Sequence, residues 1–484
     1  CRCNNAGMPM NSSNFSKKRP SNSITVIGGG LAGSEAAYQA AKSGLRVAIR
    51  EMKPMRFSPA HSMDGLAELV CSNSLKAVDL AAASGILKDE MARLGSVIIT
   101  AAYETRVAAG GALAVDRAAF SEFVTQSLLK AGVEIIREEA VNITDELASG
   151  PLVIATGPLT SDAFASAISS TVGAESCYFY DAVAPIVYRD SINMDRVFNA
   201  SRYGKGGNDY INCPLDEGEY ERFVAELLSA DRQPARAPTL PSPVKGEEIR
   251  KGSSRGGEKE GVVSLEALPL FAGCMPIEAM AQRGPMTLMF GPMKPVGLVD
   301  PRTGARPYAA VQLRSENRDG TLYNIVGFQT RLGFKDQQRV FRLIPGLENA
   351  EFARLGKMHR NTYIDSPRLL MNTQQLKANP MIFFAGQITG VEGYCESAVS
   401  GILAGINAAR LMKGMPLVCP PPTTVTGALL GHISSCEGPF QPMNANLGLL
   451  PPLERVIKRK GDRKAALAQR ALEDFSVWMK INGL

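Results

Sequence analysis

The stretch ITVIGGGLAGSEAAYQAAKSGLRVAIRE, Ile24 to Glu51, decides the fold. An apolar strand leads into a run of glycines, and a small-residue helix follows as far as Ser43. Gly44 stops the helix, and a second apolar strand ends on Glu51. Periodicity and glycine punctuation together predict a βαβ unit at the start of the ordered chain.

The glycine run fits the pattern G-x-G-x-x-G. In that pattern Gly28 makes the tight turn, Gly30 lets the backbone approach a pyrophosphate, and Gly33 lets the helix pack on the strand. Free N–H groups at the start of the helix would face the phosphates. Glu51 ends the next strand, where a carboxylate can bond ribose hydroxyls. The expected dinucleotide-binding residues are Gly28, Gly29, Gly30, Leu31, Ala32, Gly33 and Glu51.

A second glycine-rich loop, AGQITGVEGY at 385–394, follows an apolar strand and opens a long small-residue helix. Flavoproteins that bind two nucleotides use this arrangement to bring a helix dipole toward the isoalloxazine ring and the pyrophosphate. Together with the ATG triplet at 155–157, the loop favours FAD over NAD. There is no second G-x-G-x-x-G, so a separate nicotinamide site of the familiar kind is not visible. The residues added to the cofactor site are Ala155, Thr156, Gly157, Gly386, Gln387, Gly390, Gly393 and Tyr394.

The βα pattern therefore occurs at both ends of the chain, with a stretch of Gly, Tyr and Pro punctuation between them. This arrangement predicts an α/β fold: a Rossmann-like FAD-binding domain of the glutathione-reductase type, interrupted by a smaller inserted α+β domain. Residues 231–260 hold few large apolar side chains, so burial cannot offset their ordering entropy and we expect a disordered insert. The expected divisions are a disordered tail at 1–23, FAD-binding segments at 24–183 and 326–484, and the inserted domain at 184–325. The last segment is expected to end in basic, amphipathic helices.

Composition narrows the classes of function. The net charge of +6 permits a polyanionic partner without requiring one. Nine scattered cysteines without a C-x-x-C pair favour reduced thiols and a cytoplasmic location, and three histidines without H-x-x-x-H make a metal site unexpected. No apolar run approaches the roughly 20 residues of a membrane span. The acid-free segment 1–23 is also compatible with a processed transit peptide, in which case the location would be organellar.

Cys71 lies in ELVCSNSL, Glu68 to Leu75, among small polar residues. We expect a helix over Ser72–Leu94, with Ser72 as its N-cap, so that the helix dipole would favour a thiolate at Cys71. The alternative is a buried packing thiol, which is the commoner role of a free cysteine. Position alone leaves both roles open.

Several blocks of the chain, in order, resemble the TrmFO family of folate- and FAD-dependent tRNA uracil-5-methyltransferases. They are VIGGGLAGSEAA, AELVCSNSL, GKGGNDYINCP, CMPIEAMAQRG, FGPMKPVGL, GFQT, RVFRLIPGLENAEFARLGKMHRNTYI, FFAGQITGVEGY and PMNANLGLLPPL. The resemblance runs from about Ile24 to Leu453. The chain departs from the family in its N-terminal tail, the insert at 231–260, Gly29 where many members have alanine, and the region around Cys419 to Cys436.

The resemblance implies methylation at C5 of uridine 54 in the tRNA T loop. It implies FAD as cofactor, 5,10-methylenetetrahydrofolate as carbon donor, NADH or NADPH as reductant and tRNA as partner, with no obligate protein partner. Uracil C5 becomes nucleophilic only after a group such as a thiolate adds to C6, and a base must then remove the C5 proton. Carried over from the family, Cys274 in FAGCMPIE adds to uracil and Cys71 removes the proton. The reverse assignment stays open.

Two other functions compete with this one. GidA/MnmG flavoproteins install carboxymethylaminomethyl groups at wobble uridines, but they usually carry GGGHAG in the first loop and a longer helical C-terminus, and neither occurs here. A third hypothesis is that the protein is a non-catalytic RNA-binding flavoprotein. Such a protein would have no need of both Cys71 and Cys274.

Overall fold

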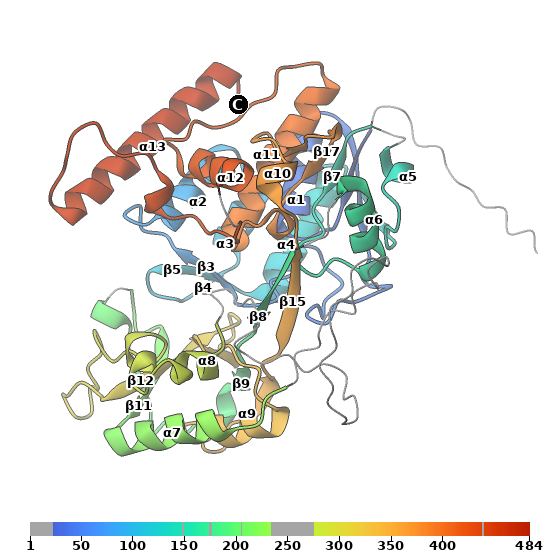
Figure 1. Ribbon diagram of the computed structural model, residues 1–484. Coiled ribbons are helices and arrows are strands. Elements are labelled where there is room, and N and C mark those ends of the chain that lie inside the picture. Colours follow the sequence, from blue (N-terminus) through green and yellow to red (C-terminus); the bar gives the residue numbers. More distant parts are fainter. Residues whose placement is uncertain (1–22, 148–149, 174–176, 205, 234–274, 438–439) are drawn as a thin grey trace, which may run out of the picture.

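The computed structural model describes residues 23–147, 150–173, 177–204, 206–233, 275–437 and 440–484. A larger part holds both the early and the late elements, and a smaller part below it holds the middle of the chain (Figure 1). The larger part is built on a six-stranded sheet, ordered β16-β17-β7-β1-β2-β6. Its strands are β1 (Ser23–Ile27), β2 (Arg46–Glu51), β6 (Glu134–Arg137), β7 (Leu152–Ile154), β16 (Gln375–Leu376) and β17 (Asn379–Phe384).

Every neighbouring pair in this sheet is parallel except the pair of β16 and β17. The late strand β17 lies beside β7, so the C-terminal segment completes the sheet that the N-terminal segment begins. The Rossmann-like α/β fold predicted from the sequence is therefore confirmed. The tail was expected to extend to residue 23, but β1 already includes Ser23; residues 1–22 lie outside the described residues.

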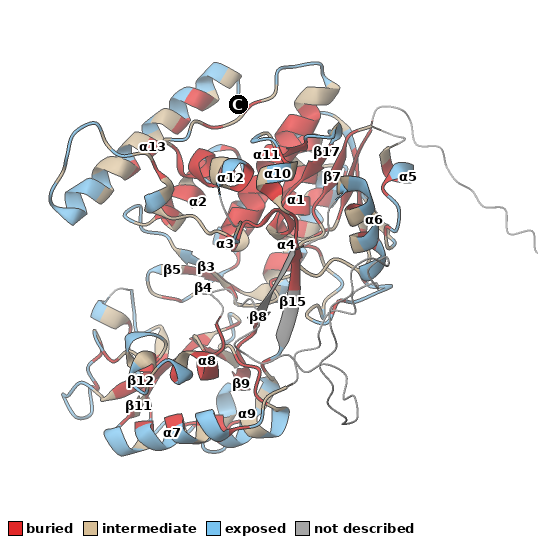
Figure 2. Cartoon of the chain, viewed as in Figure 1, coloured by how far each residue is buried: buried red, intermediate tan, exposed pale blue. Residues whose placement is uncertain are grey.

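Helices α1 (Leu31–Lys42) and α11 (Tyr394–Met412) pack against each other in the buried centre (Figure 2). A Cβ added at Gly401 would lie 2.1 Å from the carbonyl oxygen of Ala32, and one at Gly405 would lie 2.4 Å from that of Ala36. Only glycine permits this approach, because backbone cannot move aside as a side chain can. The contact joins the first βαβ unit to the end of the chain.

The remaining elements of the larger part surround this core. They are β3 (Ser74–Ala77), β4 (Arg106–Val107), β5 (Ala112–Val115), α2 (Ala83–Arg93), α3 (Val97–Glu104), α4 (Arg117–Lys130), α5 (Thr144–Leu147), α6 (Asp162–Val172), α10 (Ser366–Leu369), α12 (Val425–Ser435) and α13 (Lys460–Asn482). The basic C-terminal stretch forms the single helix α13. No helix among the described residues is long and apolar enough to cross a membrane.

The helix predicted over Ser72–Leu94 is wrong in its first half. Residues Ser74–Ala77 form β3, which pairs with β5, and α2 begins only at Ala83. The Asp79 carboxylate accepts a hydrogen bond from the N–H of Ala81, a local turn that competes with helix formation. Leu80, which lies within the predicted helix, precedes α2 and is 44% exposed. Ser72 is therefore not a helix N-cap.

The smaller part contains a second sheet, ordered β10-β11-β12-β13-β9-β14, with helices packed on it. Its elements are β9 (Ile186–Tyr188), β10 (Phe198–Asn199), β11 (Tyr210–Leu215), β12 (Ala309–Ser315), β13 (Leu322–Ile325), β14 (Phe352–Arg354), α7 (Glu217–Ser229), α8 (Ile277–Gln282) and α9 (Phe334–Phe341). Helix α7 shows one buried and one exposed face (Figure 2), and a capping box of Asp216 and Glu219 starts it.

This second core does not stop at residue 325, the boundary expected from the sequence. Buried side chains as late as Ala350 belong to it, and β14 completes its sheet. We propose that the inserted domain ends near Arg354. The antiparallel pair of β8 (Cys177–Ala182) and β15 (Met358–Tyr363) then connects the two parts (Figure 1).

The insert expected at 231–260 begins with ordered backbone rather than disorder. Arg232 pairs with Leu332, and the N–H of Gln233 donates to the carbonyl of Arg331 at 2.7 Å. Residues 234–260 lie outside the described residues.

Replacing Gly405 with alanine tests the contact between α1 and α11. The new Cβ would meet the Ala36 carbonyl, so we expect a loss of about 1–3 kcal/mol of stability. The measurement is the midpoint of thermal unfolding. Gly431→Ala is the matched control, because Gly431 lies in α12 with open space at its Cβ position, and it should be neutral or gain up to about 1 kcal/mol. Equal effects of the two substitutions would contradict the packing argument.

Candidate functional site

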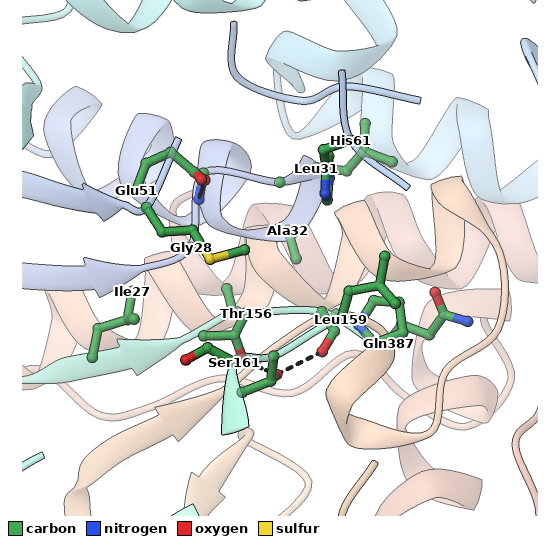
Figure 3. Close-up of a pocket in the computed structure, with 18 of the residues that line it drawn as sticks. Ile27, Gly28, Leu31, Ala32, Glu51, His61, Thr156, Leu159, Ser161 and Gln387 are labelled. Carbon is green, nitrogen blue, oxygen red and sulfur yellow. Dashed lines mark hydrogen bonds between the residues drawn. The ribbon is translucent and has the colours of Figure 1, made fainter. Parts of the chain in front are cut away.

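A pocket with about 1000 Å³ of free space lies where β1, β2 and β7 end. Ligands of open α/β sheets bind at this edge, outside the carboxyl ends of the strands. Figure 3 shows Gly28, Glu51 and Thr156, from the ends of three neighbouring strands, around the pocket, with Gln387 joining from the C-terminal segment. The predicted residues that line it are Gly28, Gly29, Gly30, Leu31, Ala32, Glu51, Ala155, Thr156, Gly157, Gly386, Gln387 and Tyr394.

Three predicted cofactor residues do not line this pocket. A Cβ at Gly33 would lie 1.8 Å from the carbonyl oxygen of Gly28, so Gly33 serves helix packing. Gly390 lies against the Phe440 ring, and Gly393 lines a neighbouring pocket. Sequence reasoning missed other lining residues, among them Arg50, His61, Glu138 and Ser161. Glu138 directly follows β6, so the strand-end rule that selected Glu51 would also have found it.

The residues around this pocket fit a dinucleotide. Gly28 has a φ of +98°, and a Cβ there would lie 2.5 Å from the Ala155 carbonyl oxygen. At Gly30 a Cβ would meet nothing within 4 Å, so this backbone faces open pocket space. Helix α1 begins without a side-chain cap, which leaves its first N–H groups available to phosphate.

Glu51 is held ready as an acceptor. It is buried, and its carboxylate accepts hydrogen bonds from the N–H groups of Gly29 at 2.7 Å and Lys53 at 3.0 Å. Each carboxylate oxygen has a second lone pair, so both can also accept from ribose hydroxyls.

A second pocket, with about 1220 Å³ of free space, adjoins the first. The two share the lining residues Val70, Pro158, Leu159, Gln387 and Tyr394. Cys71 lines the second pocket and is partly exposed. A molecule in the second pocket would therefore contact both the thiol and whatever fills the end of the first pocket.

Tyr394 holds the backbone around Cys71. Its phenol oxygen accepts from the N–H of Cys71 at 2.9 Å and from that of Ser72 at 3.1 Å. The prediction that a helix N-terminus favours a thiolate at Cys71 is wrong, because Ser74–Ala77 is a strand. Cys274 lies outside the described residues. Among the described residues, Ile277 N–H donates at 2.7 Å to the carbonyl of Gln329, which lines the second pocket.

Polar groups also line the second pocket. Lys76 Nζ donates at 2.8 Å to Glu396 Oε1, and although burial opposes the charge, this carboxylate raises the pKa of Lys76. Glu396 Oε2 and Asn361 Nδ2 are buried and have no hydrogen-bond partner among the described residues. A buried donor or acceptor without a partner costs stability, so both atoms are suited to ligand contacts.

Two other cysteines show what packing thiols look like in this protein. Cys395 is buried beside the glycine loop, and burial raises its pKa to about 12. Cys213 is buried in the second core, and burial raises its pKa as well. Neither thiol would ionise near neutral pH, and both are more deeply buried than Cys71, which is partly exposed.

Comparisons with known proteins show the family of this chain. The family model described as "Glucose inhibited division protein A" matches residues 23–416. The protein named Methylenetetrahydrofolate--tRNA-(uracil-5-)-methyltransferase TrmFO in Geobacter sulfurreducens is 56% identical over 94% of this chain and 98% of its own length. The one from Dictyoglomus thermophilum, with the same name, is 53% identical over 93% of this chain and 97% of its own length.

The chain belongs to the TrmFO family. The solved structure of Aquifex aeolicus GidA covers 96% of this TrmFO-family chain and 74% of its own chain, with a TM-score of 0.65 and 16% identity. That likeness shows a shared fold alone. The sequence resemblance to TrmFO is thus confirmed at the level of the family.

Tyr394→Phe tests whether the phenol holds the Cys71 segment of this TrmFO-family protein. The substitution leaves the N–H groups of Cys71 and Ser72 without their acceptor, so their amide hydrogens should exchange about tenfold faster, equivalent to about 1.4 kcal/mol. Hydrogen exchange of peptides spanning 66–75 measures this. Tyr308→Phe, in the smaller part, is the control and should leave these peptides unchanged. Unchanged exchange in Tyr394→Phe would show that the hydrogen bonds do not order the segment.

Proposed function

We propose that this protein transfers a one-carbon unit from 5,10-methylenetetrahydrofolate to C5 of a uridine in tRNA and forms 5-methyluridine. The observation that carries the proposal is identity of 52–56% over at least 93% of the chain to relatives named for this reaction. The finer assignment is uridine 54 of the T loop, with FAD as the bound cofactor and NADH or NADPH as the source of electrons.

The first pocket is the proposed FAD site. The glycine turn at Gly28–Gly30 admits the pyrophosphate, the start of α1 supplies N–H donors, and Glu51 accepts from the ribose. When bound and reduced by NADH or NADPH, the flavin would supply the two electrons that turn the transferred methylene into a methyl group. Tyr394 and Gln387, shared by both pockets, would separate the cofactor from the substrates.

The second pocket is the proposed site of carbon transfer. Cys71 lines it and supplies the thiol that either adds to uracil C6 or removes the C5 proton. Asn361 Nδ2 is a donor and Glu396 Oε2 an acceptor. Both uracil and the pterin of folate present a carbonyl next to a ring N–H, so this pair of protein groups suits either ring.

Gly30→Val tests the FAD site. Its φ of −72° suits any residue, and a Cβ there meets no protein atom, so the apoprotein should keep its thermal unfolding midpoint. The side chain would occupy the space of the pyrophosphate, and the flavin absorbance per protein should fall at least about tenfold. Gly111→Val, in an exposed turn with open space, is the control and should keep its flavin. Full flavin in Gly30→Val would place the cofactor elsewhere.

The activity is tested with a full-length tRNA transcript that carries both uridine 54 and a wobble uridine, together with labelled methylenetetrahydrofolate and NAD(P)H. We expect label in 5-methyluridine at position 54, and loss of at least about 100-fold in Cys71→Ala, because general acid–base or nucleophilic groups contribute that much. Cys436→Ala is the control, because Cys436 lines neither pocket. Label at a wobble uridine would transfer the function to the GidA type. RNA binding without any label transfer would favour the non-catalytic reading.

A further inference from the structure

The backbone from Leu69 to Cys71 belongs to no helix or strand, and arginine side chains bind its carbonyl groups. Arg117 donates from Nη1 to the Leu69 oxygen and from Nη2 to the Cys71 oxygen at 3.0 Å. Arg354 donates from Nη1 to the Val70 oxygen at 3.3 Å and from Nη2 to the Cys71 oxygen at 3.2 Å. Three successive carbonyls thus converge on two guanidinium groups.

The position of Arg117 is unfavourable for the helix that carries it. Arg117 is the first residue of α4, where the helix dipole disfavours a cation. The buried carboxylate of Glu316 offsets this cost, because it accepts from Arg117 Nε at 2.5 Å and from Nη2 at 3.3 Å. Arg117 thus carries a positive charge where the helix dipole disfavours one, and its side chain binds the Leu69–Cys71 segment rather than its own helix. This points to a role in that segment.

The charge of Arg354 is not offset in the same way. No ion pair within 4 Å is formed by Arg354 among the described residues, and its Nε is buried without a hydrogen-bond partner there. Two guanidinium groups and one carboxylate therefore surround the Cys71 backbone, which leaves an excess of one positive charge. Positive charge near a cysteine favours its thiolate form.

We propose that Arg117 and Arg354 act as a cationic clamp, which positions Cys71 in the wall of the second pocket and favours its thiolate. Both are positioning residues, because they bind the Cys71 segment rather than the substrate pocket. Arg117 comes from the larger part and Arg354 from β14 of the smaller part. The reactive state of the thiol thus depends on how the two parts are seated. The catalytic meaning of the clamp rests on the proposed function, but its effect on the thiol does not.

Other ionisable groups surround the same segment. Arg314 on β12 donates to Ser72 Oγ at 2.6 Å, and burial raises the pKa of Tyr394 on α11, so the phenol is neutral. The charged or ionisable groups that face Cys71 or share its pocket are Arg117, Arg354, Glu316, Arg314, Tyr394, Lys76, Glu392, Cys395 and Glu396. Arg354 and Arg314 form no ion pair within 4 Å among the described residues, and of these two Arg354 is the one that binds the Cys71 carbonyl. Its removal therefore takes an unpaired charge away from that group without exposing a buried carboxylate.

The test is the rate of Cys71 alkylation by iodoacetamide between pH 5.5 and 9.5, followed by mass spectrometry of the peptide that contains Cys71. In Arg354→Met and Arg354→Gln we expect alkylation at pH 7 to slow by about tenfold, with the pH profile displaced to higher pH. Gln keeps a hydrogen-bond donor but not the charge. Arg354→Lys keeps the charge and should stay within about threefold of the parent protein.

The matched control is Arg342→Met. Arg342 also donates twice to a backbone carbonyl, that of Ala350, but in the smaller part and away from Cys71. The Arg342→Met substitution should leave the rate of Cys71 alkylation unchanged. An unshifted profile in folded Arg354→Met, or equal slowing in Arg342→Met, would overturn the proposal. If Arg354→Met does not fold, Arg354→Gln is compared with Arg354→Lys instead. Equal rates of Cys71 alkylation in these two variants would overturn the proposal.

This experiment uses neither folate nor tRNA. A displaced profile in a protein that fails to methylate tRNA would leave the clamp standing and refute the proposed function. Normal methylation with an unshifted profile would refute the clamp and leave the proposed function standing.

Discussion

The contact between α1 and α11 is the constraint on which the rest of this structure depends. Glycine at 401 and 405 lets the backbones of the two helices meet, and Gly386 repeats the approach at the pocket, where a Cβ would lie 2.8 Å from that of Ala32. Residues nearly 370 positions apart in the chain thereby form one wall of a single pocket. In the proposed FAD site, the early glycine turn would supply the space for a pyrophosphate, and the late loop supplies Gln387 and Tyr394 at the junction with the second pocket. Neither end of the chain could build the site alone.

The same arrangement explains why the thiol lies where it does. Tyr394 is the first residue of α11, so the helix that completes the first pocket also carries the phenol that binds the N–H groups of Cys71 and Ser72. A shift of α11 along α1 would move the cofactor loop and the Cys71 segment together. Close glycine packing suppresses such a shift, because packed backbones have no flexible side chains between them to accommodate it.

Sequence reasoning succeeded where the determining contacts are local. The βαβ unit, the turn at Gly28 and the position of Glu51 follow from residues within about 30 positions of one another, and the structure places them as expected. Reasoning failed at Ser72–Leu94, where apolar spacing suggested one helix but the pairing of β3 with β5 and the turn at Asp79 prevail. The surroundings of Cys71 lay out of reach for a different reason: Arg354 is 283 residues away, and an arginine that binds a carbonyl leaves no pattern in the sequence around either partner.

A helix N-terminus and arginine side chains can both stabilise a thiolate, but they do so by different means. A helix N-terminus stabilises a thiolate with partial charges that belong to one element, so its effect is fixed once that helix forms. Arginine side chains bring whole charges from two elements, and the effect depends on the distance between those elements. In this fold the second source is β14, in a part of the molecule joined to the first by the β8 and β15 pair. A thiol controlled in this way is most reactive when both parts are in place, which suits a reaction that must await a large substrate.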